Sequence, residues 1–319
     1  MGANAQADVL RRIADAVLYE GYMLWPYRKS ALKNRQRFTF GGVYPPRWED
    51  WSSIQAQVLL EGDEDTRIEA RVRFLQVVRR QVMRFDLRTG RQEPVEEMLS
   101  DGERWVSWEE AVERELAPGP IRVRAGDRVQ RISGGSIRRS WRSLEGELSL
   151  AREELRPGLW RVTARLLNTT SWRGDGREDA LRQTFCSAHL VLRAHGGAWV
   201  SCTDPPPQMR AAAELCENVG VWPVLVGEPH QRGTMLASAI ILPDHPEIAP
   251  ESPGDLFDSG EIDQLLVLSI LSMTDEERRD MRDSDPRARE ILERTEALSE
   301  EQIMRLNGAV RDLGMVRPR

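Results

Sequence analysis

Between residues 52 and 201, apolar and polar residues alternate along several short stretches. Leu159 to Asn168 shows the clearest alternation, and Ile137 to Leu150 shows it too. A period of two is typical of half-buried β-strands. The run from Ile68 to Leu87 is rich in β-branched and aromatic residues, and it is long enough for a bent strand or two. These patterns predict a central antiparallel β-sandwich-like region.

Turn residues separate these stretches. His195-Gly196-Gly197 predicts a hairpin that joins a strand over 184–193 to one over 198–201. Trp105 to Leu116 mixes strand and helix patterns, and its assignment stays open. After a run of three prolines, residues 208–218 predict a helix and residues 221–226 a short strand.

Helical spacing marks both ends of the chain. Residues 5–20 repeat apolar side chains at helical intervals up to Gly21, and residues 261–273 are apolar in the same way. Thr274, followed by acidic residues, predicts a helix N-cap. We therefore expect an α+β fold: a central antiparallel β-sandwich-like region, an N-terminal helix and a helical C-terminal region. The expected parts are residues 1–51, 52–203 and 204–319.

Composition narrows the class of protein. The 319 residues are 40% hydrophobic and 30% charged, which favours a folded chain. A net charge of −6 argues against a general nucleic-acid binder. No apolar run reaches the roughly 18–20 residues that span a bilayer, and the N-terminus has no signal-peptide core. We expect a cytoplasmic protein that does not insert into a membrane, with self-association left open.

Metal and cofactor chemistry has weak support. The three cysteines, Cys186, Cys202 and Cys216, lack the close pairs of structural zinc sites. On a regular strand Cys186 and His189 would face opposite sides, although Cys186 and Cys202 can meet across the expected hairpin. Buried structural thiols are therefore favoured, and no metal is expected. Nucleotide-binding and hydrolase motifs are missing from the sequence, so we expect no cofactor.

Residues 19–37 have the most unusual local composition. Aromatic and basic side chains interleave there, and both lysines of the chain, Lys29 and Lys33, belong to this segment. Such a segment can stack on nucleic acid, pack internally, or form a partner-binding patch, since Tyr, Trp and Arg dominate interface hot spots. A second cluster, over residues 247–263, is acidic and proline-rich, and a solvated face is its favoured interpretation.

Three stretches resemble a known family: residues 17–28 with 33–35, residues 222–228, and residues 248–258 with 261–263. Together they resemble an uncharacterised protein of about 300 residues encoded in actinobacterial-type gene clusters for oxygen-tolerant nickel–iron hydrogenases. The resemblance extends from the first predicted helix to Thr274-Asp275-Glu276-Glu277. It implies a role in hydrogenase assembly or operation, but it assigns no reaction and no catalytic residue.

These observations favour a non-catalytic accessory or scaffold protein of hydrogenase maturation, which binds a hydrogenase subunit or maturation factor. The expected binding residues are Tyr22, Trp25, Tyr27, Arg28, Lys33, Asn34, Arg35, Glu228, Glu251 and Asp255. The alternative is an enzyme of unknown reaction whose site lies between the aromatic/basic and acidic loops, using Glu20, Arg28, Glu228, Glu251 and Asp255. A third hypothesis, a structural subunit of a redox complex, predicts an exposed apolar patch.

Overall fold

The computed structural model describes residues 41–48 and 51–246, and in the C-terminal part residues 270, 273–284, 289, 292–293 and 295–297. These residues belong to two compact units, one up to residue 246 and one from residue 270 onward. Each unit is described by itself.

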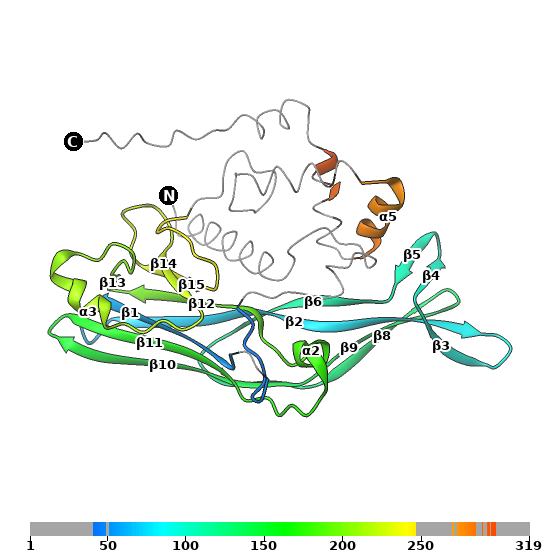
Figure 1. The fold of residues 1–319 in the computed structure, drawn as a ribbon, viewed down its shortest axis with the longest axis horizontal. Helices are drawn as coiled ribbons and strands as arrows, with labels where there is room; N and C mark the ends of the chain where they lie inside the picture. The colour runs from blue at the N-terminus through cyan, green and yellow to red at the C-terminus, as the bar shows by residue number, and fades with distance from the viewer. Residues whose placement is uncertain are drawn as a thin grey trace. The chain divides into compact units, whose positions relative to one another are not determined.

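Antiparallel strands dominate the first unit, and its helices are short (Figure 1). The strands are β1 (Ser53–Glu61), β2 (Arg67–Asp86), β3 (Arg91–Val95), β4 (Glu97–Ser100), β5 (Glu103–Val106), β6 (Trp108–Leu116), β7 (Gly119–Val123), β8 (Gly126–Ile132), β9 (Gly135–Trp141), β10 (Leu144–Arg156), β11 (Leu159–Asn168), β12 (Cys186–His195), β13 (Ala198–Trp199), β14 (Trp222–Leu225) and β15 (Thr234–Ser238). The helices are α2 (Gly176–Leu181), the 3-10 turn η2 (Pro207–Met209) and α3 (Arg210–Glu214).

Two sheets pack face to face as a sandwich. The first has the order β13-β1-β11-β10-β7, and the second contains the path β14-β15-β12-β2. Their inward side chains alternate along each strand and share one core, as in Ile54 and Val58 of β1 and Val72 and Phe74 of β2. The rings of Phe74 and Phe185 meet edge to face at 4.8 Å between centroids. Burial of this apolar core is the main stabilising term of the sandwich.

Strand β2 is 20 residues long and pairs with four partners. β6 pairs with some of the same β2 residues as β12 and β9 do, so β6 must lie on the opposite edge of β2 from both of them. β3 likewise shares β2 residues with β9 and therefore lies on the same edge as β6. The second half of β2 therefore leaves the sandwich and carries β3, β8 and β9 with it, as Figure 1 shows. We call the end of β2 from Arg79, with β3, β4, β5, β8 and β9, the arm.

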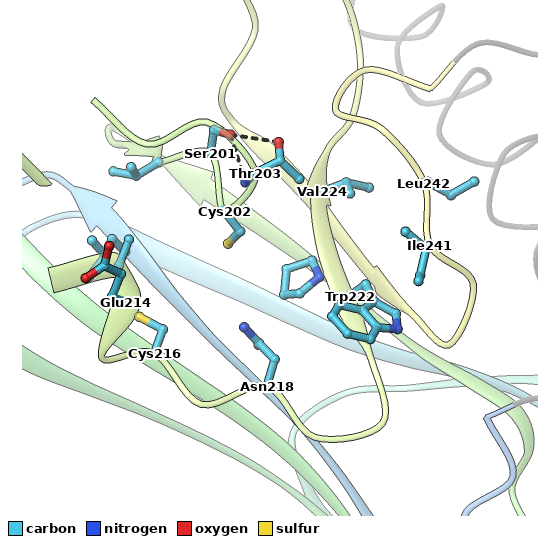
Figure 2. Close-up of a pocket in the computed structure, with 14 residues that line it drawn as sticks. Ser201, Cys202, Thr203, Glu214, Cys216, Asn218, Trp222, Val224, Ile241 and Leu242 are labelled. Atoms are coloured by element: carbon cyan, nitrogen blue, oxygen red, sulfur yellow. Dashed lines mark hydrogen bonds between the residues drawn. The ribbon is translucent and has the colours of Figure 1, made fainter. Parts of the chain in front are cut away.

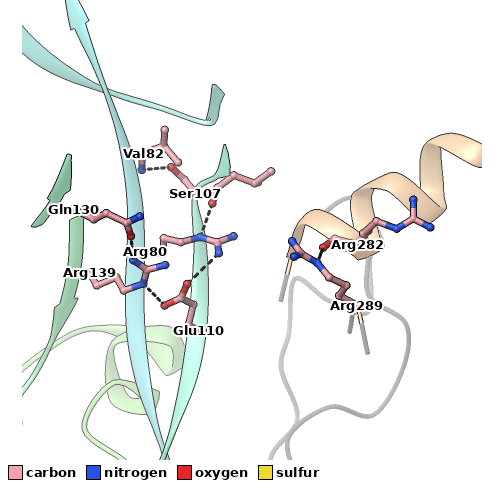
Figure 3. Close-up of polar contacts among 9 residues, drawn as sticks. Arg80, Val82, Ser107, Glu110, Gln130, Arg139, Arg282 and Arg289 are labelled. Carbon is pink, nitrogen blue, oxygen red and sulfur yellow. Dashed lines mark hydrogen bonds and ion pairs between the residues drawn. The ribbon is translucent and has the colours of Figure 1, made fainter. Parts of the chain in front are cut away.

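Charged side chains join β2, β6 and β9 at the base of the arm. Glu110 accepts from Arg80 Nη1 at 3.0 Å and from Arg139 Nε at 2.8 Å, and Arg80 Nε donates to the Val106 carbonyl at 2.9 Å (Figure 3). Next to this network the buried Gln76 amide donates to the Arg142 carbonyl at 3.0 Å, and its oxygen accepts from Arg114. Buried polar groups are tolerated here because each has a partner.

The expected α+β class is wrong. The structure is mostly β, with antiparallel sheets and few, short helices. The helix expected over residues 5–20 lies outside the described residues, as do most of residues 261–319, so no N-terminal helix and no extended helical C-terminal region belong to the described fold.

Within the sheets, several local predictions can be compared with the structure. Leu159–Asn168 is strand β11, and the ambiguous stretch 105–116 is extended, in β5 and β6. The expected hairpin at His195-Gly196-Gly197 is wrong, because β12 pairs with β2 and β15 whereas β13 pairs with β1 in the other sheet. That turn crosses between the sheets. The sheet also continues past residue 203 through β14 and β15, while the three-part division of the chain stays a prediction.

The second unit contains helix α5 (Asp275–Ser284). Its predicted N-cap is confirmed as a reciprocal pair: the Thr274 amide donates to the Glu277 carboxylate at 2.6 Å, and the Glu277 amide donates to the Thr274 hydroxyl at 3.4 Å. Further along, Arg289 Nε donates to the Arg282 carbonyl at 2.8 Å (Figure 3). None of the helices in the described residues is long and apolar enough to cross a membrane.

Candidate functional site

Most of the residues predicted to bind lie outside the described part of the chain. Tyr22, Trp25, Tyr27, Arg28, Lys33, Asn34, Arg35, Glu251 and Asp255 are in this group, so their grouping stays a prediction. Glu228 is described: it is exposed, in a turn where its amide donates to the Gln231 side chain at 3.2 Å. This turn directly follows β14, which belongs to one of the three resembling stretches.

A pocket of about 400 Å³ lies beside β14 (Figure 2). Five segments form its walls: β1, the segment after β13, α3 with the residues that follow it, β14, and the loop after β15. The volume is within the range of small-ligand sites, roughly 300–1,000 Å³. Sequence reasoning missed this pocket, because its walls come from segments that are up to about 180 residues apart.

The lining of the pocket is mostly apolar. The lining residues Leu59, Val200, Val224 and Leu242 are buried, whereas Trp222 is 53% and Ile241 is 72% exposed. Figure 2 shows the indole of Trp222 beside the labelled Ile241. The remaining lining residues are Ser201, Cys202, Thr203, Ala213, Glu214, Cys216, Asn218 and Pro223.

Asp244 fixes the wall on the side of β14. Its carboxylate accepts from the hydroxyls of Ser201 and Thr203, at 2.5 and 2.8 Å, and from the Leu225 amide at 2.8 Å. These bonds tie the segment after β13 to β14, so the pocket wall is preorganised. They also hold both hydroxyls in fixed positions.

Two free thiols line the pocket. Burial raises the pKa of Cys202 to about 12, with smaller contributions from Cys216 and Asp244. Burial also raises the pKa of Cys216, against the opposing effect of Arg161. Thiolate is the nucleophilic form, so both thiols are weakly reactive at neutral pH. The sequence favours buried structural thiols for all three cysteines. Cys186 is fully buried, whereas Cys202 and Cys216 are half-buried.

The expectation that Cys186 and His189 face opposite sides is wrong. A bulge lies between them, so Cys186 pairs with Leu75 and His189 with Arg73. Because Arg73 and Leu75 are two residues apart, Cys186 and His189 lie on the same face of the sheet. Ser187, within the bulge, has a φ of +49°.

His189 is fully buried on this face. Its Nδ1 is 3.3 Å from the Ser187 carbonyl, and its Nε2 has no hydrogen-bond partner among the residues that the structure describes. Burial, with a smaller effect of Arg73, lowers its pKa to about 3, so the ring is neutral at physiological pH. Among the described residues, no three His, Cys, Asp or Glu side chains cluster in a way that could hold a metal ion.

Comparison with known proteins does not assign the chain to a family. No protein-family model matches the chain, and no curated protein matches its sequence significantly. The pocket and the exposed aromatic residue on its rim are thus the features of the described structure that bear on function.

Proposed function

We propose that this chain is a non-catalytic accessory or scaffold protein that binds a subunit or maturation factor of a nickel–iron hydrogenase. The resemblance of three stretches to a protein of hydrogenase gene clusters motivates the proposal. The aromatic/basic patch from Tyr22 to Arg35 remains its predicted contact region, in the cytoplasm.

One observation carries this proposal. The resembling stretch over residues 222–228 forms β14 and the following turn, and it supplies Trp222, Pro223 and Val224 to the pocket. An exposed tryptophan beside a preformed apolar pocket is typical of a binding surface, because Trp contributes large contact area at interface hot spots. A structural role alone would favour burial of this side chain.

Affinity purification of the tagged full chain from a hydrogen-oxidising actinobacterial host tests the proposal. We expect stoichiometric recovery of a hydrogenase subunit or maturation factor, identified by mass spectrometry. Tyr27→Ala with Arg28→Ala should weaken this recovery at least about tenfold, since a hot-spot pair contributes at least 1.4 kcal/mol. Arg128→Ala, on the exposed strand β8, is the matched control. Recovery of the chain alone, from cells with active hydrogenase, would contradict the proposal.

A further inference from the structure

Exposed apolar side chains gather around the pocket. Trp222 and Ile241 line it, and Leu215 and Val219 flank the lining residues Glu214, Cys216 and Asn218 in the chain. Trp51 belongs to the same group, because its ring lies directly against Gly220, where an added Cβ would be 2.8 Å from the ring. Half of the ten exposed large hydrophobic residues in the described part of the chain belong to this group: Trp51, Leu215, Val219, Trp222 and Ile241. We call these five residues the pocket rim.

The pocket rim is wider than a small molecule would need. A ligand within about 400 Å³ would cover the lining residues but would leave Trp51, Leu215 and Val219 in water. A protein surface covers both the pocket and the side chains around it, and contiguous exposed apolar patches mark such interfaces. The breadth of the rim therefore favours a protein over a small ligand.

Recognition there depends on side chains rather than on strand addition. Leu225, on β14, has its amide bonded to Asp244 and its carbonyl bonded to the His245 amide at 2.7 Å. Pro223 has no amide hydrogen to offer. The outer edge of β14 is thus closed to a further strand, and a partner must insert side chains into the pocket instead.

The charged side chain that lines the pocket is acidic. Glu214 lines it and makes no ion pair with the described residues, and Glu217 lies three residues further along the chain. Arg161 is engaged by Glu153 at 2.6 Å, and Arg210 is exposed at the other end of α3. A second copy in a two-fold dimer centred on Glu214 would place the same carboxylates against each other, which is unfavourable.

We propose that the pocket and the pocket rim bind a protein other than this chain, which inserts an aliphatic or aromatic side chain and places a basic residue beside Glu214. The identity of that protein, a hydrogenase subunit or maturation factor, rests on the proposed function. Its required apolar and basic side chains do not. Burial of the inserted side chain supplies affinity, and the basic residue supplies orientation.

Site-specific photocrosslinking in the actinobacterial host tests this directly. p-Benzoylphenylalanine replaces Ile241 on the rim of the full chain, and in a matched control it replaces Leu87, which is 90% exposed on the arm. We expect the rim probe to cross-link another protein through a peptide that has an apolar residue with Lys or Arg within three positions. Cross-links to this chain itself, equal cross-linking at Leu87, or an acidic target peptide would overturn the inference.

Variants then measure the two contributions separately. Glu214→Lys should reduce recovery of the cross-linked protein at least about tenfold, and Trp222→Ala should do the same, while Leu87→Ala should leave it unchanged. Glu214 is exposed, so Glu214→Lys keeps the test valid even if Trp222→Ala fails to fold. Unchanged recovery with Glu214→Lys would overturn the proposed basic contact.

The outcomes separate this inference from the proposed function. A fitting peptide from a protein unrelated to hydrogenase would support the inference and contradict the function. Purification of a hydrogenase subunit without cross-links from the rim would support the function and overturn the inference. A small molecule that co-purifies, seen by native mass spectrometry and lost in Trp222→Ala, would also overturn it.

Discussion

Replacement of Glu110 by alanine should destabilise the arm more than any exposed charge deletion. Glu110 bridges Arg80 and Arg139 at 3.0 and 2.8 Å, and the Arg80 side chain is only 7% exposed. Removal of one partner of a buried pair costs about 3–5 kcal/mol, since the other charge stays buried. Arg80 keeps its bond to the Val106 carbonyl, and Arg139 is more exposed, so we expect about 3 kcal/mol.

The matched control is Glu97→Ala on β4. Glu97 pairs with Arg104, but both side chains are at least one-third exposed, and exposed pairs contribute about 0–1 kcal/mol. Urea unfolding followed by circular dichroism gives the difference between the two variants, and hydrogen exchange of peptides from β2 and β6 localises it. A larger loss of exchange protection in Glu110→Ala is expected at the base of the arm.

A double variant isolates the electrostatic cause. Arg80→Leu combined with Glu110→Leu leaves neither charge of this pair buried, so it should recover most of the stability lost in Glu110→Ala. A Glu110→Ala effect within 1 kcal/mol of Glu97→Ala would refute the reasoning. So would a double variant that is less stable than the single one.

Three further predictions concern other parts of the first unit. Burial lowers the pKa of His189 to about 3, so between pH 7 and pH 5 this side chain takes up a proton in the unfolded state but not in the folded state. The free energy of unfolding should therefore fall by about 2 kcal/mol over this range. Urea midpoints at both pH values measure the decrease, which should be missing in His189→Leu. Gly135→Ala should destabilise the folded protein by several kcal/mol, because the new Cβ would lie 2.0 Å from the Met83 carbonyl oxygen. Gly90→Ala has open space around the new Cβ and a φ of +69°, so it should cost about 1 kcal/mol. Equal unfolding temperatures of the two variants would contradict this. Alkylation of Cys202 and Cys216 in the native protein should be slow at pH 7 and accelerate as pH rises, while Cys186 should react only after unfolding; peptide mapping that finds Cys186 labelled first would show the packing to be wrong.

The sequence predicted strands best where one face of the strand meets the core. In β11, inward Val162, Ala164 and Leu166 alternate with partly exposed residues, so periodicity alone identifies the strand. Strand β8 shows the opposite case. Five of its seven residues are exposed, and it is held by pairing with β9, so no alternation marks it.

Long-range features could not be predicted from local patterns. The turn at His195-Gly196-Gly197 has hairpin residues, but β13 pairs with Leu60 and Glu61 of β1 and so belongs to the other sheet. The bulge that brings Cys186 and His189 to one face depends on pairing with β2 and leaves no periodic signal. The candidate pocket was missed for the same reason, because its walls come from segments far apart in the sequence.

The continuity of β2 has a mechanical consequence. No glycine or proline interrupts its 20 residues, and partners on both edges would have to separate before the strand could bend. The portion of β2 in the arm, from Arg79 to Asp86, is about 23 Å long at about 3.3 Å per residue. The arm therefore acts as a stiff lever fixed in the sandwich. A tilt of about 5° at its base moves its tip by about 2 Å, so a load applied at the tip is transmitted to the core without a hinge to absorb it.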